Sequence, residues 1–592
     1  MAYDTISNID AIIIGSGFAG ICQAIEFKKN GIHDFLILEK ESDLGGTWRD
    51  NKYPGAACDI PTALYSFSFE RVQTHTSHLD HMAMLEYIRK VAVKYGILQH
   101  IRFGQRVESM VFVEDGNAHD MWEVNVNTSI GESTATRCYG AKIVVTAVGQ
   151  LHYPRIPNFP GLDDFKGEII HTAQFGKRGK GIEDYRGKKV AIIGSGASAI
   201  QILPDIQKVC EEVHLYVRTP NYILPRITLS RVPELIITSV PFLWRMYRQF
   251  LPFMSEMMLL NAVRGIYLAQ NTVKFLASIN MRLFLDASMR KALTPCYPAG
   301  ARRVLFSNTF WPAVVQPNVF VNVSGIKCFS DDGVLASDES LAKIDTIICA
   351  TGFITNPFLF GINVMGRSKK QLWKEEEGEE NKCAGYAHAY LGIATRGFPN
   401  LFFMYGPNTN AGSNSVILFF EEQAKFITRA FQFLQNQNHK SIEVKAEVEY
   451  EFNRELLERS KGLAWTKIKS SWYLAKGKNV SNWVGCADEY SERLAAVDIV
   501  KDFEIHKNGE QEASVDGCGE LSYSRGGKEE KNKRLSRLLF EVPFFFVKVP
   551  FFFVFFVLIV GNMFLELAWL VWRCWSLGRQ HGSNDGRKNK AL

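Results

Sequence analysis

The sequence predicts an α/β fold with two Rossmann-like domains, a helical insertion in the second of them and an apolar C-terminal helix. Three observations predict it. Glycine-rich loops at 15–20 and 194–199 each follow a short apolar strand and open a helix. Residues 225–295 are apolar with a helical period and repeated prolines. A run rich in Phe and Val and free of charge spans residues 549–565.

Bulk properties set the limits of the interpretation. A chain of 592 residues is long enough for two or three folded units. Its net charge of +6 is modest and no basic stripe alternates with aromatic residues, which argues against a nucleic-acid partner. The eleven cysteines form no Cys-x-x-Cys pair, so we expect neither a metal site nor a disulfide framework. The polar first ten residues predict no signal peptide.

The first glycine loop has the full context of a dinucleotide-binding unit. Strand 11–14, helix 21–30 and strand 34–38 surround the loop, and Glu39 stands 24 residues after the first glycine. Gly15, Gly17 and Gly20 allow the tight turn and the close approach of a pyrophosphate to the helix N-terminus. Glu39 can accept hydrogen bonds from ribose hydroxyl groups. The pattern therefore predicts a dinucleotide with a free ribose, and together with the opposite ribose preference of the second unit it implies FAD.

The second loop differs in the residue that follows its second strand. Strand 190–193 leads into Gly194, Gly196 and Ser198, which open a helix, and strand 213–217 ends at Arg218 and Thr219. An acid here would repel a 2′-phosphate, whereas Arg218 can pair with it through charge-assisted hydrogen bonds. The second unit is therefore predicted to bind NADPH. A surface arginine after a strand is the alternative interpretation.

Further strands and composition shifts give a domain map. Strands at 345–350 and 401–405, each followed by a glycine, are expected to return beside the flavin. The proline-punctuated stretch carries too many charges for membrane spans and is expected to be a packed helical insertion. The map comprises an FAD domain (1–150 and 341–505), an NADP domain (151–224 and 296–340), a helical insertion (225–295), a linker (506–537) and an apolar anchor (538–575).

Residues 46–59 carry the most specific signature of the chain. They read Gly-x-Trp-(four residues)-Tyr-Pro-Gly-(three residues)-Asp, which fixes six positions in fourteen. This spacing resembles the long fingerprint of the flavin-dependent Baeyer–Villiger monooxygenases, and the resemblance covers about residues 8–500. It implies that Asp59 is catalytic and that Gly46, Thr47, Trp48 and Tyr65 lie against the flavin and its phosphates. For the aromatic residues, and for Tyr53 above all, a place in the core is the alternative.

A second fingerprint agrees only in part. Residues 165–175 resemble the Phe-x-Gly-x-x-x-His segment that links the two domains in these and related flavin monooxygenases, with His171 as its histidine. The Baeyer–Villiger version usually ends with Trp and then Pro or Asp, where this chain has Phe175 and Gly176. That departure favours the sister group that oxygenates nitrogen and sulfur. Both substrate classes therefore stay open.

The resemblance also marks a pair of arginines and a late tryptophan. It implies that Arg302 reaches the NADP 2′-phosphate, that Arg303 is catalytic and that Trp472 lines the NADP and substrate cavity. There is an independent physical reason for Arg303, because a fixed guanidinium stabilises a peroxide anion and a developing oxyanion without giving up its proton. Asp59 would hold this arginine in place. Pattern and resemblance together assign cofactor contacts to Gly15, Gly17, Gly20, Glu39, Gly46, Thr47, Trp48, Asp59, Tyr65, Gly194, Gly196, Ser198, Arg218, Thr219, Arg302, Arg303 and Trp472.

The apolar tail suggests a membrane location. Its uncharged run is long enough to span a bilayer if Glu566 sits near an interface, and basic residues flank it on both sides. A helix lying in the membrane plane and a Phe-rich hairpin are the alternatives. Because cytosolic NADPH is the expected reductant, we expect a tail-anchored arrangement facing the cytosol, for example at the endoplasmic reticulum.

These observations combine into one expected activity. The chain is predicted to be an FAD-dependent, NADPH-consuming monooxygenase that uses dioxygen to insert one oxygen atom beside the carbonyl of a lipophilic ketone, giving an ester or lactone. A monooxygenase of nitrogen or sulfur atoms is one alternative. A membrane-tethered NADPH oxidase or a non-catalytic flavin-binding protein is another.

Overall fold

The computed structural model describes residues 7–114, 120–130, 133–176, 180–374, 386–437, 439–468 and 471–507. They form two compact units, a large one of residues 7–72, 78–226 and 254–507 and a small one of residues 73–77 and 227–253. Within these ranges, no helix combines the length and apolar character needed to cross a bilayer. The predicted anchor at 538–575 lies outside the described residues, as does the predicted linker apart from residues 506 and 507, which end strand β22 (Phe503–Lys507).

The first sheet of the large unit is built around an apolar parallel strand. β1 (Ser7–Ile14) pairs in parallel with β2 (Phe35–Leu38) and with β6 (Ser133–Thr146). The strand order is β17-β4-β5-β6-β1-β2-β3, with β18 beside the end of β6. The other strands are β3 (Ile101–Arg102), β4 (Gln105–Val113), β5 (Met121–Ile130), β17 (Asn363–Met365) and β18 (Leu401–Phe403).

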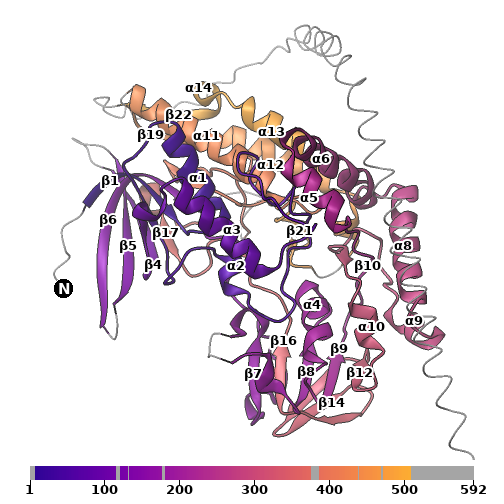
Figure 1. The fold of residues 1–592 in the computed structure, drawn as a ribbon. Coiled ribbons are helices and arrows are strands. Elements are labelled where there is room, and N and C mark those ends of the chain that lie inside the picture. Colours follow the sequence, from indigo (N-terminus) through magenta and orange to yellow (C-terminus); the bar gives the residue numbers. More distant parts are fainter. Residues whose placement is uncertain are drawn as a thin grey trace, which may run out of the picture. The chain divides into compact units, whose positions relative to one another are not determined.

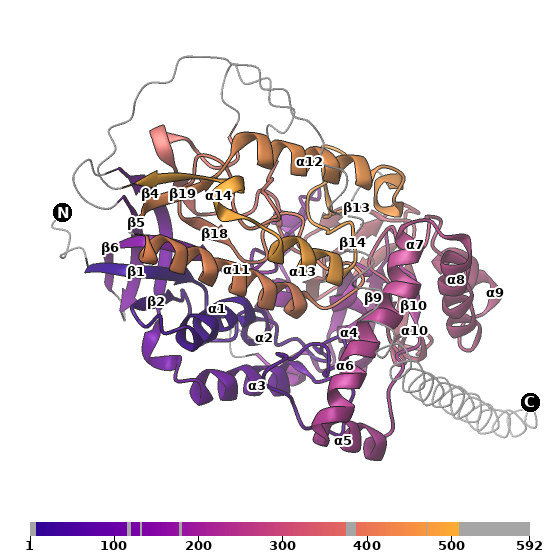
Figure 2. The same cartoon turned by 90° about the horizontal axis from the view of Figure 1, so that it is seen from above.

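Helices rich in aromatic residues cover this sheet. α1 (Phe18–Lys29) starts at the first glycine loop and packs along α11 (Val416–Asn436) (Figure 2). Between the two helices, the ring centroids of Phe27 and Phe431 lie 5.5 Å apart. Gln23 Nε2 donates to Thr428 Oγ1 at 3.1 Å between the same helices. The other helices of this part are α2 (Thr47–Asp50), α3 (His81–Lys94), α12 (Ala446–Ser460), α13 (Ala487–Ala495) and α14 (Ile499–Asp502).

The second sheet is parallel throughout, in the order β12-β9-β8-β16-β7 (Figure 1). Its strands are β7 (Glu168–His171), β8 (Lys189–Ile193), β9 (Glu212–Tyr216), β12 (Val319–Asn322) and β16 (Thr346–Cys349). The place of β16 corrects our map, which assigned residues from 341 onward to the FAD domain. After the small antiparallel sheet β13–β15 (Ile326–Ser330, Gly333–Ala336 and Leu341–Lys343), the chain re-enters the second sheet beside β8 before it returns to the first.

The two crossings between the sheets are tied together at Gly352. Its carbonyl oxygen accepts hydrogen bonds from Arg155 N and from His171 Nε2, each at 2.9 Å. Arg155 lies on the outward crossing, and Gly352 on the return. Burial lowers the pKa of His171 to about 4, so the ring is neutral at pH 7. The histidine of the second fingerprint therefore fixes the connection between the sheets.

A two-stranded parallel ribbon frames the helical insertion. β10 (Ile223–Leu224) pairs with β11 (Leu305–Phe306), so residues on either side of the insertion lie next to one another. Asn280 Nδ2 donates to the carbonyls of Ile223 (3.2 Å) and Ser307 (3.4 Å) and holds the ribbon. The intervening helices are α5 (Arg231–Ser239), α6 (Pro241–Ser255), a π-helical turn (Glu256–Leu260), α7 (Asn261–Val263), α8 (Tyr267–Arg282) and α9 (Ala287–Leu293).

In the small unit, α5 is tied to residues 73–77. Ser77 Oγ donates to Glu234 Oε2 at 2.8 Å, and Thr238 Oγ1 donates to Thr74 O at 2.8 Å. These bonds fix one side of α5 to an extended segment that is distant in sequence.

Candidate active site

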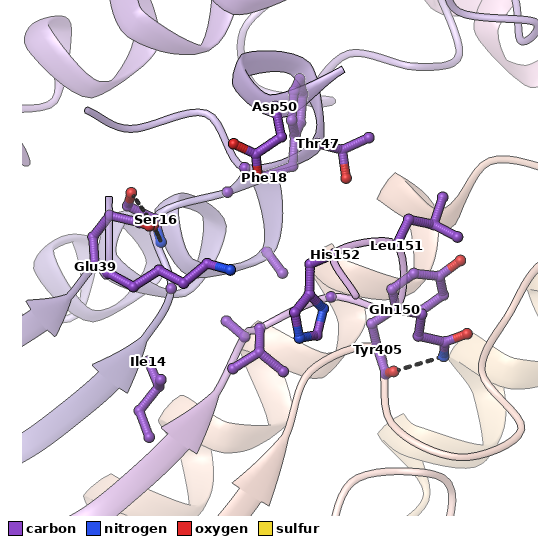
Figure 3. Close-up of a pocket in the computed structure, with 18 of the residues that line it drawn as sticks. Ile14, Ser16, Phe18, Glu39, Thr47, Asp50, Gln150, Leu151, His152 and Tyr405 are labelled. Atoms are coloured by element: carbon purple, nitrogen blue, oxygen red, sulfur yellow. Dashed lines mark hydrogen bonds between the residues drawn. The ribbon is translucent and has the colours of Figure 1, made fainter. Parts of the chain in front are cut away.

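A cavity opens at the first glycine loop, where the sequence predicts FAD. Figure 3 shows side chains of the loop, of the fingerprint and of the segment after β6 turned toward this cavity. Among the predicted cofactor residues, its lining includes Gly15, Gly17, Glu39, Gly46, Thr47, Trp48 and Tyr65. The fingerprint thus contributes directly to the wall of the first site.

The loop is shaped by glycines that no other residue could replace at low cost. A Cβ placed on Gly15 (φ +104°) would lie 2.6 Å from the Ala147 carbonyl oxygen, and one on Gly20 would lie 1.9 Å from Gly15 O. A Cβ on Gly46 (φ +52°) would lie 3.2 Å from Gly17 Cα. Positive φ and these short approaches leave a backbone cradle with no side chain in front of the α1 N-terminus, as a pyrophosphate requires.

Glu39 is held at the ribose position by its neighbours. Its carboxylate accepts from Ser16 N at 2.9 Å and from Ser16 Oγ at 2.7 Å (Figure 3). Arg49 Nη1 lies 3.2 Å from Glu39 Oε1. Arg49 was not predicted, although a cation directly after Trp48 in the fingerprint is the signal that could have revealed it. The ion pair fixes the position of the buried Glu39 carboxylate beside the cavity.

The polar groups of the cavity fit a flavin. Gln150 Nε2 donates to Tyr405 O at 3.0 Å, while Gln150 Oε1 is buried and accepts no hydrogen bond from any described residue (Figure 3). A buried acceptor without a donor is costly unless a ligand supplies one. The flavin ring system has donor groups of this kind. The glycine cradle, Glu39 and Gln150 together therefore fit FAD.

The second glycine loop repeats the backbone of the first. A Cβ on Gly194 (φ +127°) would lie 2.4 Å from Ala350 O, whereas one on Gly196 would meet nothing within 4 Å. Ser198 lies in the first turn of α4 (Ala197–Ile206). Ser195 Oγ donates to Thr219 O at 2.7 Å, so the loop is tied to the end of β9. Arg218 is exposed and meets no partner in the described part of the chain, so its guanidinium is open to a phosphate.

The fingerprint runs from the first site to the second. Tyr53 is buried, and its hydroxyl donates to Gln201 Oε1 at 2.8 Å. Gln201 Nε2 donates to Ala57 O at 2.9 Å, and a Cβ on Gly55 (φ +76°) would lie 2.2 Å from Gln201 O. Gln201 belongs to α4, the helix that follows the second glycine loop. The segment therefore places Trp48 at the first cavity and packs against α4 before it reaches Asp59.

Asp59 and Arg303 form a bidentate ion pair. Arg303 Nε donates to Asp59 Oδ2 at 2.8 Å, and Arg303 Nη2 donates to Asp59 Oδ1 at 2.7 Å. Burial raises the pKa of Asp59, but the charge and hydrogen bonds of Arg303, with Arg226 adding to them, hold it below its ordinary value. The charge of Asp59 raises the pKa of Arg303 above its ordinary value. Both groups therefore stay charged, and the arginine has a fixed orientation.

The remaining predicted residues, Arg302 and Trp472, each lie beside a tyrosine ring. Arg302 Cζ stands 5.5 Å from the centroid of the Tyr297 ring. Trp472 is partly buried against Tyr473, with ring centroids 4.4 Å apart. Burial raises the pKa of Tyr473 to about 12, with the charge of Arg303 lowering it and that of Asp59 raising it, so Tyr473 lies near the ion pair. Its position directly after Trp472 in the sequence was the signal for it.

Two further residues near the ion pair were not predicted. His78 and Arg226 both act electrostatically on Asp59. Burial lowers the pKa of His78 to about 3, so this ring is neutral. They follow no motif, since His78 precedes α3 and Arg226 follows the short strand β10, and only the fold brings them to Asp59.

One group of side chains in the described residues has the spacing of metal ligands, namely Glu443, Glu504 and His506. Arg367 Nη1 lies 3.1 Å from Glu443 Oε1 and 2.8 Å from His506 Nε2. A guanidinium therefore already provides the positive charge, and the group is an ion-pair network.

Comparison with known proteins agrees with this geometry. The sequence profile of the flavin-binding monooxygenase-like family matches residues 10–375. A Baeyer–Villiger monooxygenase of Streptomyces coelicolor is 32% identical over 513 residues, which cover 83% of this chain and 92% of the relative. Another from Pseudomonas aeruginosa is 32% identical and covers 80% and 87%.

A solved structure shows the same fold. The cyclohexanone monooxygenase from Rhodococcus sp. Phi1, bound to NADP+, superposes with a TM-score of 0.71 at 26% identity, over 85% of this chain and all of that protein. The predicted family and its two cofactors are thereby confirmed. This chain belongs to the flavin-binding monooxygenase family, as an FAD- and NADP-dependent enzyme of the Baeyer–Villiger type.

Proposed function

We propose that the enzyme oxidises a ketone to an ester or lactone with Asp59 and Arg303 as its catalytic pair. The observation that supports these roles is the bidentate ion pair between Asp59, which ends the 46–59 fingerprint, and Arg303, which lies just before β11. A guanidinium held on two atoms by a buried carboxylate has one orientation. Its remaining N–H groups can then be directed at a reacting oxygen.

The cofactors divide between the two glycine loops. When bound, FAD reduced by NADPH supplies the activation of dioxygen. The first cavity, with Glu39 at the ribose, would hold FAD. The loop at Gly194 and the exposed Arg218 would hold NADPH. Arg302, next to Arg303 in the sequence, would add a contact to the 2′-phosphate. The hydrogen bond from Tyr53 to Gln201 of α4 would hold the 46–59 segment in place between the two cofactor sites.

Arg303 would act on the charge that develops at the substrate. Addition of an oxygen nucleophile to a ketone carbonyl places negative charge on the carbonyl oxygen, and a preorganised cation stabilises that charge without reorganisation. Because the pKa of Arg303 is raised, it cannot act as a proton donor at neutral pH. It therefore keeps the nucleophile deprotonated as well. Asp59 would position Arg303 and prevent it from turning away.

Replacement of the two residues tests this assignment. Arg303→Ala is expected to abolish ester formation from a cyclic ketone and to leave reduction of the flavin by NADPH measurable by its absorbance. Arg303→Lys keeps a charge but loses the fork, and it should retain little activity. The ester-forming activity of Asp59→Asn should lie between the activities of these two variants. If the Ala variant still made ester at the wild-type rate, the proposed roles would be wrong.

Oxygenation of nitrogen or sulfur is the second candidate, and Phe175 is the observation that favours it. In the structure, Phe175 is buried in the core of the second sheet and stacks on Tyr185, with ring centroids 5.3 Å apart. It packs rather than lines the flavin cavity. A panel of a cyclic ketone and a matched thioether, assayed side by side, decides between the two substrate classes.

We propose a membrane anchor on the strength of the sequence alone. The uncharged run at 549–565 and its basic flanks support a C-terminal attachment with the catalytic part in the cytosol, and this would favour lipophilic ketones. Deletion of residues 538–592 should move the protein from the membrane fraction to the soluble fraction. A soluble full-length protein with the same activity on lipophilic ketones would contradict the proposal.

A further inference from the structure

Arg226 adds a second guanidinium beside the Asp59–Arg303 pair. Among the described residues, Asp59 is the carboxylate that acts on Arg226. Both oxygens of that carboxylate are already bonded to Arg303. His78 is neutral, so two cations face one anion at this point. The cluster therefore carries an uncompensated positive charge.

The backbone of Arg226 is fixed in place. Arg226 N donates to Asn308 Oδ1 at 2.7 Å, and Asn308 Nδ2 donates back to Arg226 O at 2.9 Å. Asn308 follows β11, so this reciprocal pair extends the β10–β11 pairing, whose other end begins just after Arg303. The ribbon thus carries both arginines on a rigid frame. The backbone of Arg226 therefore has a fixed position just after β10.

The side chain of Arg226 has an unused donor. Its Nε–H is buried and donates to no described residue. A buried charged donor without an acceptor costs free energy, and it is stabilised when a ligand brings an anionic oxygen. Substrates without such a group would leave this cost in place. A group with these properties is expected to recognise a ligand.

We propose that Arg226 is an anion-binding residue of the active site and receives a carboxylate oxygen of the substrate, so that the enzyme favours keto acids over neutral ketones. The inference rests on the proposed function, because it names the substrate class of the same site. The shared chemistry is one anionic oxygen bonded by a guanidinium. A phosphate oxygen of NADP is the other source of such an oxygen, and the test below separates the two.

The experiment uses the full-length, FAD-loaded enzyme and three variants. Arg226→Gln removes the charge, Arg226→Lys keeps it without the fork, and Arg282→Gln alters an exposed arginine in the last turn of α8 as a matched control. Two binding constants are measured without turnover, those of octanoate (with octanol as its neutral control) and of NADP+. The KM of a keto acid is then compared with that of the matched neutral ketone.

In Arg226→Gln, the Kd of octanoate should rise by roughly tenfold or more, as for the loss of one hydrogen bond to a charged group. The ratio of the KM for the keto acid to the KM for the neutral ketone should rise by the same factor. Arg226→Lys should recover part of the loss, and Arg282→Gln should match the wild type. If NADP+ binding weakens by that factor instead, the anionic oxygen belongs to the cofactor and the substrate proposal is overturned.

Two other results would also overturn it. One is unchanged binding of both octanoate and NADP+ in Arg226→Gln. The other is an equal loss of activity on the keto acid and the neutral ketone, since Arg226 would then act through Asp59. The binding arms need no turnover, so a failure of ketone oxidation itself would be seen separately as the failure of the proposed function.

Discussion

The two glycine loops share one backbone plan and differ at the residue that ends the second strand. In both, the first glycine has a positive φ and lies against an alanine carbonyl, Ala147 for Gly15 and Ala350 for Gly194. At the first site, Glu39 is 4% exposed and accepts from the loop serine. At the second, Arg218 points to solvent and the loop serine bonds to Thr219 O instead.

This difference separates pyrophosphate binding from ribose recognition within one motif. The glycines and the helix N-terminus serve any pyrophosphate, so they are alike in both units. We expect the residue after the second strand to meet the ribose, and it is a buried acid in one dinucleotide-binding unit and an exposed cation in the other. We therefore expect cofactor choice to depend on this one position in each unit and binding to depend on the backbone.

Substitution of the glycines is expected to have the largest effect. Gly15→Ala should abolish flavin incorporation, and Gly194→Ala should abolish NADP+ binding while FAD is retained, because each Cβ would meet a carbonyl oxygen at 2.6 or 2.4 Å. Gly181→Ala is the matched control, since this glycine lies outside both loops and its Cβ would meet nothing within 4 Å. Flavin content by absorbance and NADP+ binding by titration measure both effects. Loss of both cofactors in either variant would contradict the independence of the two loops.

Replacement of Arg218 should have the next largest effect. Arg218→Ala is expected to raise the KM for NADPH by roughly 10- to 100-fold, the range for one charge-assisted contact, and to leave the KM for NADH unchanged. Steady-state kinetics with both nucleotides measure the change. An equal change for NADH would show that Arg218 does not distinguish the 2′-phosphate.

The sequence predicted what depends on local pattern. Both glycine loops, the ribose residues and the partnership of Asp59 with Arg303 are all found at the predicted positions, because strand, loop and helix follow each other directly or because a family fingerprint fixed the spacing. The assigned roles of these residues remain predictions. The family and the cofactors, which rest on the same motifs, are confirmed.

What the sequence could not show depends on pairing between distant segments. β16 joins the second sheet, since an apolar strand fits either parallel sheet and its partner is set by topology. Arg226 and His78 reach Asp59 only through the β10–β11 ribbon and the segment before α3. The Tyr53–Gln201 bond likewise joins residues 148 positions apart, and no local pattern reveals it.

A smaller effect is expected at His171, which joins the two chain crossings between the first and the second sheet. Its pKa is lowered from 6.5 to about 4, so the unfolded chain binds more protons between these values and the folded state loses stability as the pH falls through this window. The loss from this residue alone is roughly 2 to 3 kcal/mol. His171→Asn should remove that part of the pH dependence, measured by urea unfolding at pH 7.5 and 4.5. The exposed His33→Asn is the control, and an identical pH dependence in both variants would contradict this role.

The smallest effect on chemistry is expected at Phe175. Phe175→Trp restores the residue usual in the Baeyer–Villiger fingerprint, yet it should change the ratio of ketone to thioether oxidation by less than about twofold, because the ring stacks on Tyr185 in the core of the second sheet. The larger ring should instead lower the free energy of unfolding by about 1 to 3 kcal/mol through overpacking. Product ratios and urea unfolding of one protein preparation give both numbers. A large shift in the product ratio would mean that this packing position acts on the substrate site, and that the two units differ in more than their ribose residues.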